Sequence, residues 1–264
     1  MKINRIQDAR DYNRRLPLVV RWVHIASAAL NAVASGSWRW LDSPARRLWA
    51  WPALFLALAL LAYPFDRSIS QFLRSLQPRG DLARELGAWQ QFGALGSVLF
   101  TALVIWLLDP ANRRRLLDLA AAWIATGLAC TLVKMLLGRP RPRYDDPFYF
   151  TGPFGLYPIE SAGQRLMRSP MAFWERGVAD LWSMPSSHTT AAVTLALFLS
   201  ALYPRLRHIC IFLVALVAFA RIALSDRGSH WPSDVLAGIS FALLLSGAAL
   251  RARWGSRLVQ IQAE

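Results

Sequence analysis

The sequence has few charged residues, few acidic residues and few candidates for disulfides or metal ligands. Only 17% of its 264 residues are charged and 55% are hydrophobic, whereas about a quarter of the residues of a soluble domain are charged. Its two cysteines, Cys130 and Cys210, lie far apart in or beside apolar runs, so we expect unpaired packing residues. No group of Cys, His or carboxylate residues has metal-ligand spacing, and we therefore expect no metal and no other cofactor.

What the sequence does contain is a series of long apolar runs. They predict an all-α integral membrane protein, a bundle of six helices, because near-continuous hydrophobicity favours helices and the turn signals of barrel strands are absent. The expected spans are Leu48–Phe65, Phe92–Leu108, Leu116–Leu137, Thr189–Tyr203, Ile209–Leu224 and Val235–Leu250. The connection between the third and fourth spans, residues 138–188, is too long for a simple connector and predicts a long outer loop.

Three regions are expected along the chain. Residues 1–47 are basic and only patchily apolar, which predicts a cytoplasmic segment whose part from Pro17 to Trp40 lies as a helix at the membrane interface. We expect no cleavable secretory signal there. Residues 48–250 form the six-helix domain, and residues 251–264 form a cytoplasmic tail.

The basic excess, a net charge of +14, is unevenly distributed. With both termini in the cytoplasm, the segments on that side carry many more Lys and Arg than Asp and Glu, whereas the opposite loops are nearly balanced. This bias is what the positive-inside rule expects of a protein in a bacterial inner membrane. The charge therefore predicts orientation and attraction to membrane lipids, and it argues against nucleic-acid binding. It carries no information on oligomeric state.

In this orientation, three polar clusters lie on the face away from the cytoplasm. The first contains Lys134, Arg139, Arg141 and Arg143, at the end of the third span. Guanidinium groups and one ammonium suit the oxygens of a phosphate group. The alternative is a snorkelling lysine with a basic flank.

The second cluster runs from Ser183 to His188, directly before the fourth span. Ser186 and Ser187 stand at a helix start, where free main-chain N–H groups and the helix dipole favour an anion. His188, in the first turn, is a candidate general acid. The alternative is an ordinary serine cap followed by an unrelated histidine.

The third cluster contains Arg221, near the end of the fifth span, and the stretch Gly228–Asp234. An arginine in an apolar helix is costly unless it meets an anion or faces the bundle interior. His230 and Asp234 are four residues apart, so Asp234 can accept the ring N–H of His230 and leave the other nitrogen free as nucleophile or base. The alternative is a helix cap with an interfacial histidine.

Together the clusters resemble the three signature motifs of the type-2 phosphatidic acid phosphatase superfamily, over roughly residues 90–250. The motifs are Lys134 followed after six residues by Arg141-Pro142, the run Pro185-Ser186-Ser187-His188, and Arg221 with His230 and Asp234. The resemblance implies a six-helix membrane bundle and metal-independent dephosphorylation through a phosphohistidine.

The resemblance also implies a role for each residue. His230 would be the nucleophile, Asp234 its orienting carboxylate, and His188 the acid that protonates the leaving group. The phosphoryl oxygens would be held by Lys134, Arg141 and Arg221, with the main-chain N–H groups around Ser186 and Ser187.

Two positions depart from the family pattern. Ser187 stands where the family often has glycine, and eight residues separate Arg221 from His230, three more than is usual in the family. Arg227 is therefore an alternative to Arg221 as the phosphate ligand. We favour Arg221 because a helix positions a side chain more rigidly than a loop.

These observations predict a lipid phosphate or pyrophosphate phosphatase with its site at the periplasmic face. Polyprenyl pyrophosphate, phosphatidylglycerol phosphate, phosphatidic acid and lipid A phosphate all remain possible substrates. An alternative with the same site is a phosphotransferase that passes the phosphoryl group between lipids. A transporter or lipid-binding membrane protein is a weaker alternative because the charged residues gather at one face instead of stepping through the bilayer. A vanadate-dependent haloperoxidase is the weakest because the chain is embedded in the membrane.

Overall fold

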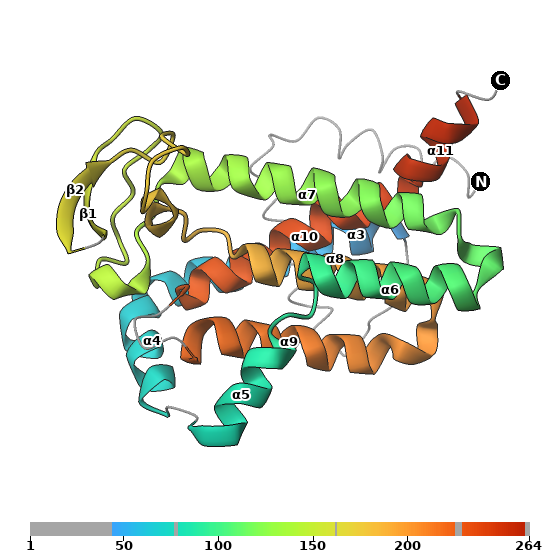
Figure 1. Cartoon of the computed structure of the whole chain (residues 1–264), viewed down its shortest axis with the longest axis horizontal. Helices are drawn as coiled ribbons and strands as arrows, with labels where there is room; N and C mark the ends of the chain where they lie inside the picture. The colour runs from blue at the N-terminus through green and yellow to red at the C-terminus, as the bar shows by residue number, and fades with distance from the viewer. Residues whose placement is uncertain (1–43, 77–78, 162, 225–228, 262–264) are drawn as a thin grey trace, which may run out of the picture. The chain divides into compact units, whose positions relative to one another are not determined.

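The computed structural model describes residues 44–76, 79–161, 163–224 and 229–261 (Figure 1). The chain divides into two compact units, residues 1–50 and 51–264. Only Pro44–Ala50 of the first unit lie in the described part, so the interfacial helix predicted from Pro17 to Trp40 falls outside it.

Helices make up most of the described chain. They are α3 (Pro44–Ala62), α4 (Asp66–Ser75), α5 (Gly80–Trp89), α6 (Leu95–Leu108), α7 (Arg115–Leu137), α8 (Ser187–Leu202), α9 (Arg207–Ala223), α10 (Pro232–Ala252) and α11 (Trp254–Ile261). Two short strands, β1 (Tyr157–Ser161) and β2 (Gln164–Arg168), pair antiparallel. Short 3₁₀ turns stand at residues 63–65, 110–112, 142–144, 178–181 and 204–206.

Each predicted span corresponds to a helix, but the helices differ in length. Four helical segments are long and apolar enough to cross a membrane: Leu48–Ser75, Arg115–Tyr144, Pro204–Ala223 and Pro232–Arg257. The apolar helices α6 and α8 are shorter. The protein is therefore a mostly helical integral membrane protein, while the count of six crossing helices stays a prediction.

Two features of the fold were not predicted. The β1–β2 hairpin lies within the connection between α7 and α8, so the chain is mostly helical and not all-α. The described part also holds the additional helices α4, α5 and α11. Polar residues in α4 and α5, such as Asp66 and Asp81, interrupt the apolar runs there. Hydrophobicity alone therefore did not predict α4 and α5.

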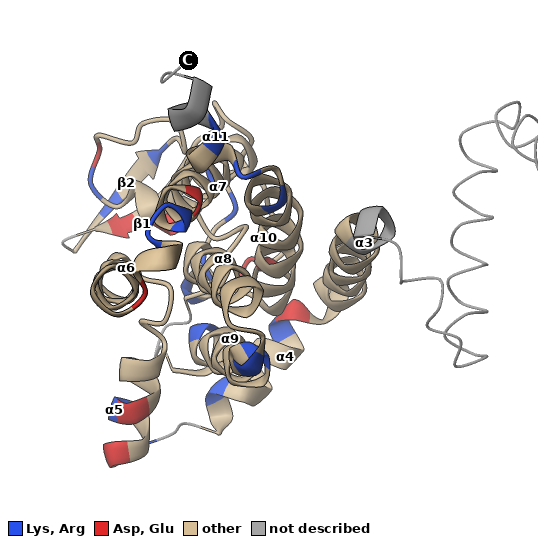
Figure 2. Ribbon diagram, turned by 90° about the vertical axis from the view of Figure 1, so that its right-hand side faces the viewer, with Lys and Arg blue, Asp and Glu red and all other residues tan. Residues whose placement is uncertain are grey.

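Helix α8 lies at the centre of the helices of the second unit, with α7, α9 and α10 around it (Figure 2). Its sequence is apolar with small residues on several sides, which suits a helix that is enclosed by neighbours. Its buried residues are Thr189, Thr190, Ala192, Val193, Thr194, Leu195, Ala196 and Phe198. Leu195 and Phe198 join a core cluster with Val98, Ile105, Leu119, Ala122, Ala249 and Leu250.

Two glycines bring the elements of the site together. Gly138 ends α7 in the left-handed conformation, with φ of 62°, and a side chain there would collide with Thr151 and Pro170. The chain can therefore turn sharply from α7 into Arg139. Gly238 lies where α10 crosses α8, and a Cβ atom there would stand 2.9 Å from the carbonyl oxygen of Ser186. The start of α8 and the start of α10 are thus in close contact.

Candidate active site

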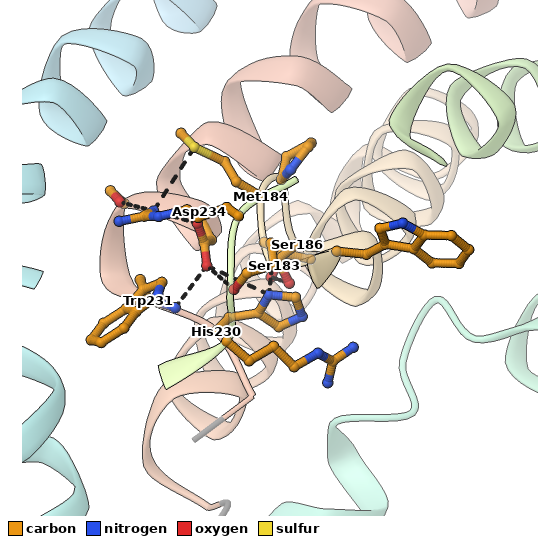
Figure 3. A network of polar contacts seen from close by, with 12 residues as sticks. Ser183, Met184, Ser186, His230, Trp231 and Asp234 are labelled. Carbon is orange, nitrogen blue, oxygen red and sulfur yellow. Dashed lines mark hydrogen bonds and ion pairs between the residues drawn. The ribbon is translucent and has the colours of Figure 1, made fainter. Parts of the chain in front are cut away.

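His230 is held by a main-chain carbonyl group and not directly by Asp234. Its side chain is buried, and its Nδ1 atom lies 2.7 Å from the carbonyl oxygen of Ser183 (Figure 3). Because a carbonyl oxygen can only accept, Nδ1 carries the proton and Nε2 keeps its lone pair. Asp234 Oδ2 lies 3.8 Å from Nδ1, so the expected hydrogen bond between the two side chains is not formed. The ring therefore has the predicted tautomer, with one nitrogen free, but the acceptor of its proton is the Ser183 carbonyl group and not Asp234.

The carboxylate of Asp234 accepts hydrogen bonds from three other groups. Oδ2 accepts the main-chain N–H of Trp231 at 2.8 Å and the hydroxyl of Ser183 at 2.5 Å (Figure 3). Oδ1 accepts from Nη1 of Arg139 at 2.5 Å. The bond to Trp231 belongs to the capping box that begins α10, so Asp234 both starts the helix and lies beside the histidine.

Burial changes the protonation of His230. Removal from solvent lowers the pKa of His230 from 6.5 to about 3, and the neighbouring Asp234 carboxylate only partly opposes this effect. The imidazole is therefore neutral at physiological pH. A neutral ring with a free Nε2 is the form that can act as a nucleophile.

Arg139 is wholly buried and links two carboxylates. Its Nη1 atom binds Asp234, and its Nη2 atom binds Asp66 Oδ2 at 2.6 Å. Asp66 also accepts the main-chain N–H of Ser233 at 2.9 Å and its hydroxyl at 2.5 Å. Arg139 further lies over the rings of Tyr63, Phe150 and Trp231. These contacts lock the start of α10 in place.

Asp66 was missed from the sequence, and Arg139 was noted only as part of a basic run. The available signal for Asp66 was an acidic residue at the end of a hydrophobic stretch, directly after Tyr63-Pro64-Phe65. Such a residue is expensive in a membrane protein without a partner. The identity of that partner depended on the tertiary structure.

Three of the predicted phosphate ligands form one cationic cluster, Lys134, Arg141 and Arg221. Lys134 is buried near the end of α7, and the charges of both arginines act on it. Arg141 and Arg221 also act on each other. None of the three forms an ion pair with any residue in the described part of the chain. Their contacts are to neutral groups: Lys134 Nζ to the carbonyl of Trp182 at 2.6 Å, Arg141 Nε to that of Ala179 at 3.0 Å, and Arg221 Nη1 to Gln90 Oε1 at 3.4 Å.

Arg221 has unused donor capacity. Its Nε atom is buried and makes no hydrogen bond within the described residues. A half-buried guanidinium with a free donor, beside two other cations, is a site suited to an anion. The alternative residue, Arg227, lies outside the described residues.

The second motif lies against the same cations. The charges of Arg221, Lys134 and Arg141 all act on His188, which is half-buried. Lys134 and Arg221 act on His230 as well. His188 lies at the start of α8 and His230 in the segment before α10. The two histidines therefore share one cationic environment.

Ser186 and Ser187 differ in what they can offer an anion. The main-chain N–H of Ser186 donates to the carbonyl of Asp234 at 3.0 Å, so the expectation that this group binds phosphate is wrong for this conformation. Ser187 is the first residue of α8 and is exposed. Its N–H and that of His188 belong to the first turn, where helical N–H groups have no intrahelical acceptor.

The part of the chain that the structure describes contains no preformed cluster of metal ligands. No group of three or more His, Cys, Asp or Glu in that part of the chain is arranged to hold a metal ion. The absence of a metal requirement remains a prediction.

Residues 115–258 match the PAP2 superfamily. The matched region begins at the first residue of α7 and continues into α11, so it includes all three motifs. It covers more than half of the chain.

Two relatives are named lipid A 1-phosphatase. The protein from Rhizobium etli is 30% identical over 118 residues, which are 45% of this chain and 41% of that protein. The protein from Rhizobium johnstonii is 25% identical over 171 residues, which are 59% of this chain and 61% of that protein. The chain thus spans less than two thirds of the length of either relative.

A solved structure has a similar fold. It is a transmembrane PAP2-type phosphatidylglycerolphosphate phosphatase from Bacillus subtilis, with a TM-score of 0.54 and 20% sequence identity. The similarity covers 79% of this chain and 96% of that chain. At this identity the likeness concerns the fold.

Proposed function

The chain belongs to the PAP2 superfamily, and on that premise we propose that it is an integral membrane hydrolase of lipid phosphate esters. The observation that carries this proposal is the cluster of Lys134, Arg141 and Arg221 beside His188 and His230. Three cations that have no carboxylate partner among the described residues leave a site for a dianionic phosphoryl group. Phosphoryl transfer depends mainly on holding and neutralising the equatorial oxygens of that group.

In the proposed first step, Nε2 of His230 attacks phosphorus and the bond from phosphorus to the lipid oxygen breaks. His188, which is protonated because the bound dianionic phosphoryl group offsets the charges of the neighbouring cations, donates a proton to the leaving oxygen, which gives a lipid alcohol or a lipid monophosphate. Because the Ser183 carbonyl accepts Nδ1–H, the attacking nitrogen is the unprotonated one. Asp234 lies 3.8 Å from Nδ1 and stabilises the positive charge that develops on the ring.

In the second step, water attacks the phosphohistidine. His188, now neutral, accepts a proton from the water, the phosphorus–nitrogen bond breaks, and inorganic phosphate leaves. Both steps use only residues of this chain, so we propose that the reaction needs no metal ion. A lipid acceptor in place of water would give the phosphotransferase alternative.

We place the site on the membrane face away from the cytoplasm, in the inner membrane of a bacterium. The support is the distribution of Lys and Arg along the sequence, which favours cytoplasmic termini. Among possible substrates we put a lipid A 1-phosphate first, because two relatives carry the name lipid A 1-phosphatase. Phosphatidylglycerol phosphate comes second, from the name of the structural neighbour.

The test is release of inorganic phosphate by the purified full-length protein in the presence of a metal chelator. A panel of lipid A, phosphatidylglycerol phosphate, phosphatidic acid and a polyprenyl pyrophosphate identifies the substrate. We expect His230→Ala and His188→Ala each to reduce release at least ~1,000-fold, because each removes a group that takes part in bond cleavage.

The matched control is His208→Ala, at an exposed histidine in the first turn of α9, which should retain full activity. Near-normal release by folded His230→Ala would rule out the phosphohistidine mechanism. Transfer of phosphate to a second lipid, with no free phosphate formed, would favour the phosphotransferase.

A further inference from the structure

A groove of about 330 Å³ lies between α7 and α8 and begins beside the site. At the end nearer the site is Ser187, the residue before His188. It continues along the two helices to Trp123 and Thr194. Ser187 therefore belongs both to the second motif and to the wall of the groove.

The groove exists because α6 covers only part of the α7–α8 pair. The indole of Trp123 donates to the carbonyl of Gly93 at 3.2 Å. Gly93 itself lies so close to the backbone of Ala192 that a Cβ atom there would overlap it. Since α6 begins directly after this contact, at Leu95, the turns of α7 and α8 nearer the site lack its cover.

The lining of the groove is apolar in character, although it contains several hydroxyl groups. Thr131 donates to the carbonyl of Gly127 at 3.0 Å, Thr190 to that of Ser186 at 2.9 Å, and Thr194 to that of Thr190 at 2.9 Å. With their hydroxyls bonded to their own helices, these threonines offer methyl groups. No charged residue lines the groove.

The groove is also open on the side that faces away from the bundle. Leu128, in its lining, is 68% exposed, and Ile124 is 53% exposed. A Cβ atom on Gly127 would meet no other atom within 4 Å. In an integral membrane protein, such an opening faces lipid.

We infer that this groove binds the hydrocarbon chain of the lipid whose phosphate occupies the Lys134–Arg141–Arg221 cluster. The inference rests on the proposed function. Its support is the match of an amphiphile to the surface: cations and α8 N–H groups at one end, an uncharged trough at the other. From Ser187 to Thr194 the groove runs roughly 10 Å along α8, at about 1.5 Å per residue. That length lies within one leaflet, roughly 15 Å of a hydrocarbon core ~30 Å thick.

Such a groove makes the enzyme selective for chain length. The phosphate cluster alone recognises any phosphate ester, whereas a long chain also gains free energy when its first methylenes leave water for an apolar wall. Chains already dissolved in the membrane gain less, because their gain comes from packing. For lipids in the membrane, the main effect of the groove is to orient the lipid so that its phosphate reaches Nε2 of His230.

The first experiment fills the groove. Gly127→Leu places a side chain in open space at its wall, and Gly96→Leu makes the same change on α6, where a Cβ atom also meets nothing within 4 Å. The measured quantity is kcat/KM for a long-chain lipid phosphate divided by that for a water-soluble aryl phosphate. We expect this ratio to fall about tenfold in Gly127→Leu and to stay at the wild-type value in Gly96→Leu. Equal ratios in the two variants would overturn the inference.

The second experiment needs no variant. A lipid phosphate with a photoreactive group near the head end of its chain is cross-linked to the wild-type protein, and labelled peptides are mapped by mass spectrometry. We expect labels within residues 123–131 and 187–194 that an excess of unlabelled lipid phosphate removes. Labels on α9 or α10, or labelling that a phosphate-free lipid matches, would overturn the inference. If the wild-type protein released no phosphate from any lipid, the proposed function would fail. The labelling pattern would still show whether the groove binds the hydrocarbon chain.

Discussion

At the scale of single residues, the least expected feature is that one arginine serves two carboxylates. Arg139 binds Asp234 and Asp66, and Asp66 in turn holds both the main-chain N–H and the hydroxyl of Ser233. With one cation between two anions, the group keeps a net negative charge beside His230. Without the charge of Asp66, Arg139 would have Asp234 as its one carboxylate partner and would neutralise its charge more fully.

Asp66→Asn tests this positioning role. We expect kcat to fall about tenfold, equivalent to ~1.4 kcal/mol of transition-state stabilisation, because Asp234 then stabilises the positively charged ring of His230 less well. KM should change little, since the bonds of Asp66 go to Ser233 and Arg139 and not to the Lys134–Arg141–Arg221 cluster. Steady-state kinetics with the substrate from the lipid panel measures both constants.

A matched control exists at the other end of α7. Asp118 is equally buried, accepts hydrogen bonds from Ser256 and forms an ion pair with Arg115. Asp118→Asn should lower the thermal unfolding temperature without changing kcat. If the two variants lost stability alike and kcat stayed at the wild-type value in both, Asp66 would have only a structural role.

At the scale of helices, the site depends on the contact between α8 and α10. Ser186 donates its N–H to the carbonyl of Asp234, and Gly238 lets α10 approach the carbonyl of Ser186. His188 follows this contact on α8, and His230 precedes it on the chain that leads into α10. The distance between the two histidines is therefore set by how closely the helices pack.

Gly238→Ala separates the two helices. Its methyl group would stand 2.9 Å from the Ser186 carbonyl and 3.2 Å from Thr190 Oγ1, so backbone atoms must move. We expect a destabilisation of about 1–3 kcal/mol, the usual cost of overpacking, together with a fall in kcat as His188 shifts relative to His230. Thermal unfolding in detergent and phosphate release measure the two effects.

Gly96→Ala is the control for helix propensity. It adds the same methyl group to α6 in open space, so it should leave activity unchanged and stability equal or slightly higher. An unaltered kcat in Gly238→Ala would mean that the close crossing does not determine the catalytic geometry.

At the scale of the whole molecule, the buried His230 makes stability depend on pH. Its pKa is about 3 in the folded protein, against an ordinary value of 6.5. Between these two pH values the unfolded chain binds a proton at this residue and the folded protein does not. The contribution of His230 to the free energy of unfolding is therefore fully present above about pH 6.5 and decreases as the pH falls toward 3.

His230→Asn removes the titrating ring but keeps an N–H that can reach the Ser183 carbonyl. We expect its unfolding temperature to decrease less than that of the wild-type protein between pH 7 and pH 4. His208→Asn, the same change at an exposed histidine, should follow the wild-type curve. Parallel curves for all three proteins would show that His230 does not contribute to the acid sensitivity.

The sequence by itself determined the membrane class, the helical character and the residues of the three motifs. Long apolar runs are a property of consecutive residues, and each predicted span corresponds to a helix. The motifs lie at the ends of these runs, so alternating passes through a membrane were enough to predict that Lys134, His188, Arg221 and His230 meet. The roles assigned to them in catalysis remain predictions.

Only the tertiary structure decided which polar groups are paired. The acceptor of the His230 ring proton comes from a residue 47 positions away, the second carboxylate on Arg139 from 73 positions away, and the anchor of Ser233 from 167 positions away. Such bonds depend on how helices pack. For the same reason, local spacing wrongly predicted a direct bond from Asp234 to His230 and a free N–H on Ser186, and it gave no sign of the groove beside Ser187.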